Sequence, residues 1–252
     1  MPKPTISLAV ITKNEAGNIE RMISSASFAD EVIVVDSGSS DNTKELCQAM
    51  GAVVIEKDWL GFAAQKQYAF DQCRCDWILS LDGDEALSPE LAEEIQTAVK
   101  MADSRTAGFS MPRISFYLGR WIRHGGWYPD RKIRLIRRSR GKWQGKGLHE
   151  KLVADGEIKP LSADILHWVY EDISHQVQTI DAYSSTHAIH AKKQGNLYLL
   201  FGLVHMAGKF FECYVWKAGF LDGLAGLVIA VNSTWYTFLK HAKVWEQHKQ
   251  HG

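Results

Sequence analysis

The stretch TISLAVITKNEAGNIERMISSASFADEVIVVDSGSSDNT, residues 5–43, contains two apolar runs separated by a segment with a different pattern. The runs at 5–12 and 31–37 are strand-like, whereas residues 14–26 space their apolar side chains as a helix does. Strands that alternate with helices pair in parallel, so the sequence predicts an α/β fold whose mostly parallel sheet is wrapped by helices. The alternation continues to residue 100, with strand-like runs at 52–58 and 77–84 and helical patterns at 40–51 and 61–73.

Length and cysteine usage set the broad class. The 252 residues are 46% hydrophobic, which can fill a substantial core, and they form one large domain or a domain with an appendage. The four cysteines lack zinc-type spacing, which indicates free thiols in a reducing compartment. Lys13 breaks the first apolar run too early for a signal peptide, so we expect a cytoplasmic protein.

The zero net charge hides an asymmetry along the chain. Residues 1–100 carry 8 Lys or Arg against 17 Asp or Glu, whereas residues 101–160 carry 14 against 5. A basic middle in a neutral protein predicts an anionic partner for that segment alone and argues against a general nucleic-acid binder.

Acidic side chains follow two of the predicted strands. Asp82, Asp84 and Glu85 surround Gly83 after the run at 77–81. They form either a surface turn or a cation site, and in a cation site the glycine would let a ligand come close to the backbone. Asp36 ends the second strand and suits hydrogen bonding to a nucleoside, although an N-cap in a strand-to-helix loop is the structural alternative. The G-x-G-x-x-G and G-x-x-x-x-G-K-[ST] patterns are absent, which argues against a nicotinamide dehydrogenase and a P-loop ATPase.

These motifs together resemble the family 2 glycosyltransferases of GT-A fold, and more narrowly the bacterial lipopolysaccharide core β-1,4-glucosyltransferases. The resemblance covers roughly residues 4–245 and implies a Rossmann-like sheet followed by a helical C-terminal extension. Further segments that carry it are WILSLDGDEALS at 77–88, GFAAQKQYA at 61–69, GGWYPDRKIRL at 125–135, GLHEKL at 147–152 and KAGFLDGLAGLVIAV at 217–231.

The resemblance implies that the protein moves a hexose, with glucose expected, from a UDP-sugar to the inner-core heptose of lipopolysaccharide with inversion. Mg²⁺ or Mn²⁺ would be the cofactor. The implied donor-site residues are Thr12, Asn14 and Glu15 around the nucleotide, Asp36 on the uracil or ribose, Lys66 at the same sheet end, Asp82 on the ribose and metal, and Asp84 on the metal.

Glu150 in GLHEKL matches the position of the catalytic base in such inverting enzymes. In-line attack requires a base on the sugar face opposite the departing UDP, so the base must come from a different segment than the metal ligands. The structural alternative is a surface ion pair with Lys146 or Lys151. His167 and His149 are the candidates for a third metal ligand, against the alternative of structural histidines.

The basic segment 113–146 holds eleven Lys or Arg and one acid, Asp130. It is a solvated face, a clamp for a diphosphate, or a surface for a phosphorylated glycolipid or anionic headgroups. Arg134 is predicted to contact donor phosphate and Arg131 the acceptor. Trp127 and Tyr128 are predicted to stack on an acceptor sugar, unless they fill a core.

The last third reads as helical, and two apolar stretches lie within it. Residues 223–239 are uncharged but contain Asn232, Ser233 and Thr234, and residues 197–208 are shorter, so neither is predicted to span a bilayer. Flanking Lys, Trp and Tyr favour helices that lie in the headgroup layer, and the alternative is packing on the domain or on a partner subunit. We expect a peripheral protein on the inner face of the cytoplasmic membrane.

The expected organisation is a GT-A domain at 1–170, with a nucleotide-sugar half at 1–100 and an acceptor half at 101–170, followed by a helical region at 171–252. Transfer to another surface glycan, nucleotidyl transfer, and a catalytically silent membrane-surface protein are the alternative functions. A nucleotidyltransferase would need a first loop rich in Gly, Lys and Arg, and TKNEAGN has only one Lys, which a Glu balances. The sugar, the acceptor hydroxyl and the oligomeric state are left open.

Overall fold

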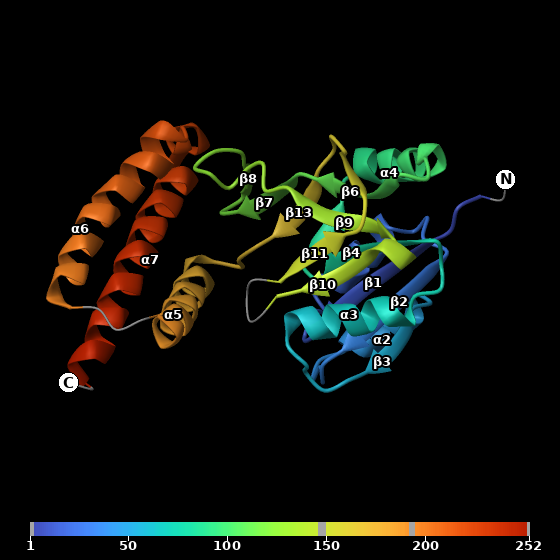
Figure 1. The fold of residues 1–252 in the computed structure, drawn as a ribbon, viewed down its shortest axis with the longest axis horizontal. Helices are drawn as coiled ribbons and strands as arrows, with labels where there is room; N and C mark the ends of the chain where they lie inside the picture. Colours follow the sequence, from blue (N-terminus) through green and yellow to red (C-terminus); the bar gives the residue numbers. More distant parts are fainter. Residues whose placement is uncertain (1–2, 146–149, 192–194, 251–252) are drawn as a thin grey trace. The chain divides into compact units, whose positions relative to one another are not determined.

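The computed structural model describes residues 3–145, 150–191 and 195–250 (Figure 1). The chain divides into two compact units. The sheet unit comprises residues 1–113 and 130–167, and the helical unit comprises residues 114–129 and 168–252. Residues 114–129, which the sequence placed in an acceptor half with their neighbours, thus group with the C-terminal helices. The predicted division at residue 170 stays a prediction.

The sheet unit is built on a seven-stranded sheet with the order β12-β6-β9-β4-β1-β2-β3. Pairing is parallel between β1 and β2, β1 and β4, β2 and β3, and β12 and β6, whereas β9 runs antiparallel to both its neighbours. The predicted α/β class with a mostly parallel sheet is confirmed. The strands are β1 (Ile6–Thr12), β2 (Glu31–Asp36), β3 (Val53–Glu56), β4 (Trp77–Asp82), β6 (Thr106–Met111), β9 (Lys132–Arg137) and β12 (Glu157–Pro160).

Strand register aligns the carboxyl ends of three neighbouring strands. In β1, Thr12 pairs with Asp36 of β2, and Ile11 pairs with Asp82 of β4. Ligands of open α/β sheets bind beyond the carboxyl ends of the strands. The polar residues that follow these strands are therefore brought to one edge of the sheet.

Helices cover both faces of this sheet. Alternate side chains of a strand point to opposite faces, so Leu8 of β1 packs with α1 and α4, whereas Ala9 packs with α3. The helices are α1 (Ile19–Ser25), α2 (Thr43–Ala49), α3 (Phe62–Gln72) and α4 (Pro89–Met101). The predicted first helix is shorter than the sequence pattern at 14–26, because Asn14 has a left-handed φ of 58° and Asn18 occupies the N-cap position.

Smaller elements of the sheet unit carry further polar residues. Strand β5 (Glu85–Leu87) pairs antiparallel with β13 (Ile165–Trp168) and sets His167 opposite Glu85. Strand β10 (Gly141–Gln144) pairs with β11 (Lys151–Ala154), and Trp143 of β10 packs edge-on against Phe70 of α3. A single 3₁₀ turn, η1 (Arg138–Arg140), joins β9 to β10.

The helical unit contains most of the hairpin of β7 (Arg113–Tyr117) and β8 (Arg120–Ile122), followed by the C-terminal helices. Its core gathers Tyr117 and Ile122 of the hairpin with Ala225 and Ile229 of α7. The predicted helical C-terminal region is confirmed. Its elements are α5 (Ile173–His190), α6 (Asn196–Phe210), the π-helical η2 (Phe211–Trp216), the 3₁₀ turn η3 (Gly219–Asp222) and α7 (Gly223–Gln250).

Within the described residues, no single helix is both long enough and apolar enough to cross a membrane. The helices Leu197–Trp216 and Gly219–Gln247, bent by 68° at the break between them, are together long enough and apolar enough to cross one.

Candidate active site

Asp36 is fully buried at the end of β2, where it organises the following turn. Its Oδ1 accepts the backbone N–H groups of Gly38 at 3.0 Å and Ser39 at 2.8 Å. Its Oδ2 accepts the hydroxyls of Thr12, at 3.1 Å, and Ser39. Asp36 therefore fixes the loop after β2, and the N-cap position of α2 belongs to Asn42 instead.

The loop after β1 is tied to the loop after β2. The N–H of Asn14 donates to Ser39 Oγ at 2.8 Å, and Asn14 Oδ1 accepts the N–H of Ser40 at 2.8 Å. The N–H of Glu15 donates to Thr43 Oγ1 at 2.8 Å. Four polar loop residues and Thr43, the first residue of α2, thus hold the two loops together at the carboxyl edge of the sheet.

The Glu15 side chain lies against the D-G-D turn. A Cβ on Gly83 would stand 2.6 Å from Glu15 Cγ, so only glycine leaves room for Glu15 at this distance. Burial raises the pKa of Glu15, and the negative charges of Asp84, Asp41 and Asp82 add to that rise, although the hydrogen bond from Asn18 opposes it. The sequence expected the glycine to admit a ligand to the backbone, whereas the structure shows it admitting a carboxylate side chain.

Asp82, the first acid of the turn, is bound by two cations. Lys66 Nζ lies 2.7 Å from its Oδ1, and Arg134 Nη2 lies 2.6 Å from its Oδ2. Burial alone would raise the pKa of Asp82, but the charges of Arg134 and Lys66 outweigh it and hold that pKa well below its usual range. Arg134 is buried on β9, and its guanidinium forms ion pairs with Asp82 and Glu85. Its predicted contact with donor phosphate stays a prediction.

Glu85 extends the ion-pair network behind Asp82. Its Oε1 accepts hydrogen bonds from Arg134 at 2.7 Å and from Arg113 at 2.8 Å, and Arg113 also binds Asp130 at 2.6 Å. Burial opposes ionisation, but the charge of Arg134 prevails and the pKa of Glu85 is lowered. The sequence marked Glu85 as the third acid of the motif but did not place it in the site, and it gave Arg113 no role.

Asp84, the second acid of the turn, meets His167 from β13. Asp84 Oδ2 and His167 Nε2 lie 3.2 Å apart, with side chains 33% and 10% exposed. The pairing of β5 with β13 accounts for this approach, because it sets His167 beside the strand that follows Asp84. The other histidine considered, His149, lies outside the described residues.

Glu150 is joined to the same cluster through Lys66. Its Oε1 lies 3.3 Å from Lys66 Nζ, and that ammonium also sits 4.8 Å from the centre of the Trp143 ring. Lys66 is 4% exposed, and a buried ammonium needs such counter-charges to offset its lost hydration. The sequence suggested Lys146 or Lys151 as the ion-pair partner of Glu150, whereas the partner in the structure is Lys66. Lys146 lies outside the described residues.

Comparison with known proteins places this arrangement in a family. The family model for "Glycosyl transferase family 2" matches residues 7–152. The protein belongs to glycosyl transferase family 2. The matched segment contains Asp36, Lys66, Asp82 and Glu150, and the prediction of a glycosyltransferase is confirmed.

Two relatives of this glycosyltransferase match over almost its whole length. An uncharacterized glycosyltransferase of Rickettsia typhi is 31% identical over 253 residues, which cover 96% of this chain and 87% of the relative. The lipopolysaccharide core biosynthesis glycosyltransferase LpsC of Rhizobium meliloti is 27% identical over 260 residues, which cover 98% of this chain and 94% of LpsC.

A solved structure shares the fold of this family 2 enzyme. The mannosyltransferase PcManGT of Pyrobaculum calidifontis, determined with GDP-Man and Mn²⁺, aligns with a TM-score of 0.56 at 15% identity. The alignment covers 97% of this chain and 88% of PcManGT. The predicted GT-A fold is thereby confirmed.

The side chains of this glycosyltransferase fit a divalent cation held by two protein ligands. Asp84 and His167 supply a carboxylate and an imidazole at neighbouring positions, and Mg²⁺ or Mn²⁺ completes such a shell with phosphate oxygens and water. Asp82, the third predicted ligand, instead presents both oxygens to Lys66 and Arg134. Across residues 3–145, 150–191 and 195–250, no group of three His, Cys, Asp or Glu side chains could hold a metal ion.

The predicted acceptor residues lie in both units of the glycosyltransferase. In the sheet unit, exposed Arg131 donates to the carbonyl of Leu161 at 3.0 Å. In the helical unit, Trp127 stacks on Tyr117 with ring centres 5.9 Å apart, and Arg123 lies 5.7 Å from the ring centre of Tyr128. Trp127 thus packs on core residues, and the acceptor contacts of all three predicted residues stay predictions.

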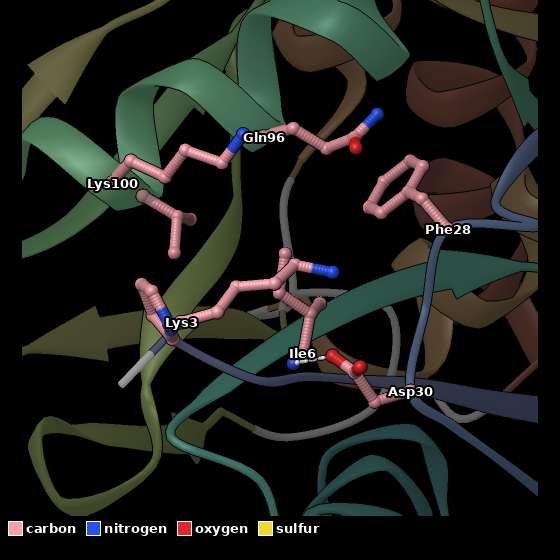
Figure 2. Close-up of a pocket in the computed structure, with 8 residues that line it drawn as sticks. Lys3, Ile6, Phe28, Asp30, Gln96 and Lys100 are labelled. Carbon is pink, nitrogen blue, oxygen red and sulfur yellow. Dashed lines mark hydrogen bonds between the residues drawn. The ribbon is translucent and has the colours of Figure 1, made fainter. Parts of the chain in front are cut away.

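A small pocket at the opposite edge of the sheet is separate from this site (Figure 2). Lys3, Phe28, Asp30 and Lys100 are among its lining residues, and Asp30 accepts the N–H of Ile6 at 2.9 Å. Ile6 begins β1, whereas Asp36 and Asp82 pair with residues at the other, carboxyl end of that strand. Its volume of about 10 Å³ admits no more than about one water molecule.

Proposed function

We propose that this enzyme is an inverting glycosyltransferase that moves glucose from UDP-glucose to the inner-core heptose of lipopolysaccharide. One observation carries the proposal: Asp36 and Asp82 end strands at one edge of the sheet, Asp84 follows the second of them, and Lys66 pairs with both Asp82 and Glu150. Polar donor-site residues and a separate carboxylate are what nucleotide-sugar chemistry needs, because the leaving group and the attacking hydroxyl lie on opposite faces of the sugar.

The donor would lie against the loops that follow β1 and β2. Thr12, Asn14, Glu15 and Asp36 fix the shape of these loops before any ligand arrives. A preorganised pocket loses less entropy when it binds the nucleotide. The uridine would contact this surface, with the diphosphate directed toward the D-G-D turn.

Asp84 and His167 would hold Mg²⁺ or Mn²⁺ in this site. The cation would stabilise the charge that develops on the departing diphosphate. PcManGT, which shares the fold, was determined with Mn²⁺. Lys66 and Arg134 would keep Asp82 ionised and oriented beside these ligands.

Glu150 would take the proton of the acceptor hydroxyl. As the acceptor oxygen forms its bond to the anomeric carbon, the bond from that carbon to the diphosphate breaks, UDP leaves, and the hydroxyl proton passes to the Glu150 carboxylate. Lys66 Nζ, 3.3 Å from Glu150 Oε1, would hold the carboxylate in place for this transfer. A positioned general base contributes roughly 10²–10⁴-fold to such a reaction.

The acceptor assignment is supported by LpsC, which is named for lipopolysaccharide core biosynthesis and matches over 94% of its own length. A glycolipid acceptor of this kind would place the enzyme on the cytoplasmic face of the inner membrane.

The test is calorimetric titration of UDP with and without Mn²⁺, followed by transfer from UDP-glucose to heptose-terminated core acceptors. We expect metal-dependent UDP binding in the wild type and in Glu150→Gln, and none in Asp84→Ala. Glu150→Gln should lose roughly 10²–10⁴-fold in turnover. Normal turnover in Glu150→Gln would contradict the assignment of Glu150 as the base. UDP binding that depends on neither Mn²⁺ nor Asp84 would contradict the proposed donor site.

A further inference from the structure

The outward face of α6 is apolar, which is the reverse of a helix on a water-exposed surface. Leu197 and Val204 are each 69% exposed, and the other members of the stripe are also exposed. Their spacing of three, four and seven residues keeps them on one side of the helix and of η2, which continues it. The stripe consists of Leu197, Leu200, Phe201, Val204, Phe211 and Val215.

Helix α6 contacts α7, which lies beside it (Figure 1), and polar side chains take part in this contact. His205 Nδ1 lies 3.3 Å from His241 Nε2, and the ring of Tyr198 lies 4.6 Å from that of His241. A Cβ on Gly202 would stand 2.6 Å from His241 Cβ, so the glycine permits this close approach. Polar side chains thus meet where the two helices contact each other, with His241 8% exposed, whereas the large apolar side chains of the stripe are exposed.

The second helix and the break between the two helices continue the apolar surface. Leu224 is 81% exposed, and Val231 and Trp235 follow it at helical spacing on α7. Trp216, at the end of η2, is 89% exposed, and Phe220 and Leu221 of η3 are also exposed. We call the exposed apolar residues of 197–235 the hairpin surface. This surface extends over α6, α7 and the break between them.

The charges of this hairpin are few and mutually paired. Residues 196–239 contain only four Asp, Glu, Lys or Arg side chains, Lys209, Glu212, Lys217 and Asp222. Glu212 is salt-bridged to Lys209 at 3.0 Å and to Lys217 at 2.5 Å. Asp222 is 2% exposed and accepts the N–H of His124 at 2.8 Å. The paired triad of Lys209, Glu212 and Lys217 leaves one net positive charge beside Trp216.

We propose that the hairpin surface is embedded in one leaflet of an anionic phospholipid bilayer as a shallow membrane anchor. An apolar face with Trp and Lys at its edge matches the acyl and headgroup layers of such a leaflet. An interface with another protein carries about one hydrogen bond per 100–200 Å², and this surface is made almost entirely of side chains that cannot form one.

A groove at the break fits this assignment. It has a volume of about 490 Å³, and Gly208, Phe211, Val215 and Trp216 are among the residues that line it. Its lining is mostly apolar and suits a hydrocarbon chain, and its two charged lining residues, Glu212 and Lys217, are salt-bridged to each other. The inference rests on the proposed glycolipid acceptor for its purpose, because an anchored enzyme meets such an acceptor in the membrane, but it can be tested without transferase activity.

The first experiment measures where the surface lies. The full-length chain carries an environment-sensitive nitrobenzoxadiazole label at Val204→Cys or Leu224→Cys, in a Cys75→Ser background because the other cysteines are buried. Vesicles contain phosphatidylethanolamine and phosphatidylglycerol at 3:1. We expect fluorescence at both positions to rise several-fold on addition of vesicles, and a label at Met101→Cys, 78% exposed on α4, to remain unchanged.

The second experiment changes the surface. Val204→Asp with Leu224→Asp should weaken flotation with the same vesicles by at least about tenfold, since each side chain contributes apolar burial. Met101→Asp is the matched control and should float like the wild type. Both variants should retain metal-dependent UDP binding, which separates a failure of the anchor from a failure of the donor site.

Two outcomes overturn the anchor. One is a label at 204 that is already shielded without vesicles in a chain that sediments as a dimer, which would assign the surface to a second copy. The other is flotation of the double aspartate variant equal to that of the wild type.

Discussion

Lys66 Nζ lies 2.7 Å from Asp82 Oδ1 and 3.3 Å from Glu150 Oε1, so one buried ammonium joins the donor-site carboxylate to the proposed base. The two acids come from different elements, Asp82 from the end of β4 and Glu150 from the segment before β11. Lys66 projects from α3 and is 4% exposed. Its charge therefore fixes the two carboxylates relative to each other, and the network continues from Asp82 to Arg134.

Removal of this ammonium should affect catalysis more than folding. In Lys66→Met, side-chain volume is retained but Asp82 and Glu150 lose a shared cation. We expect turnover to fall by at least about 10²-fold and UDP affinity to drop, because the site becomes more negative. The free energy of unfolding should fall by about 1–3 kcal/mol, with Arg134 still on Asp82. Steady-state kinetics, calorimetry and urea unfolding measure the three effects.

Lys44→Met is the matched control, because Lys44 pairs at 3.2 Å with Glu56, an exposed side chain. Such a solvent-exposed pair contributes little to stability, and turnover should not change. Wild-type turnover in Lys66→Met would show that Lys66 serves stability alone.

Gly83 is predicted to tolerate no side chain, because the Glu15 side chain occupies the space beside it. In Gly83→Ala, the new Cβ would meet Glu15 Cγ at 2.6 Å, and either the D-G-D turn or the first loop must move. Forced repacking of this kind costs about 1–3 kcal/mol, and the displaced turn should also weaken UDP binding. Gly17→Ala is the control, since nothing lies within 4 Å of its Cβ position. If both variants unfold at the same urea concentration, the close approach to Glu15 is not what requires glycine.

The raised pKa of Glu15 predicts a pH dependence of stability in metal-free protein. Burial, with the charges of Asp84 and Asp41 added, raises the pKa of Glu15 above its ordinary value of 4.5. The folded chain then binds the Glu15 proton more tightly than the unfolded chain, so this contribution is present below pH 4.5 and is lost as pH rises through the folded pKa. Glu15→Gln should therefore be more stable than the wild type at pH 7, with the difference vanishing at low pH.

Urea unfolding in EDTA across pH 3–8 measures this difference. Glu20→Gln, an exposed residue of α1, is the control and should shift stability little at any pH. A Glu15→Gln variant less stable than the wild type at pH 7 would contradict the prediction.

The alternation of elements was predictable from sequence because each strand and helix shows its own period over several residues. The edge of the sheet that carries the site was predictable too, since parallel strands end at the same edge. The partner of Glu150 was not, because Lys66 is 84 residues away and no local pattern links them. The ion pairs of Arg134 were not predictable for a related reason, because Asp82 and Glu85 are 52 and 49 residues away in the sequence. The role of Gly83 likewise depends on Glu15, a residue from another loop.

In the helical unit, Asp222 is predicted to hold the loop that carries Trp127 and Tyr128. Its Oδ2 accepts the N–H groups of Arg123 and His124, at 3.2 and 2.8 Å, and it is 2% exposed. Asp222→Asn retains one acceptor oxygen but replaces the other with a donor, which leaves a buried group badly matched. We expect the free energy of unfolding to fall by about 1–3 kcal/mol in urea. Asp181→Asn is the control, because Asp181 is an exposed partner of Lys243 and should cost less than about 1 kcal/mol. Equal losses in the two variants would show that Asp222 does no more for the loop than a surface ion pair does for its helix.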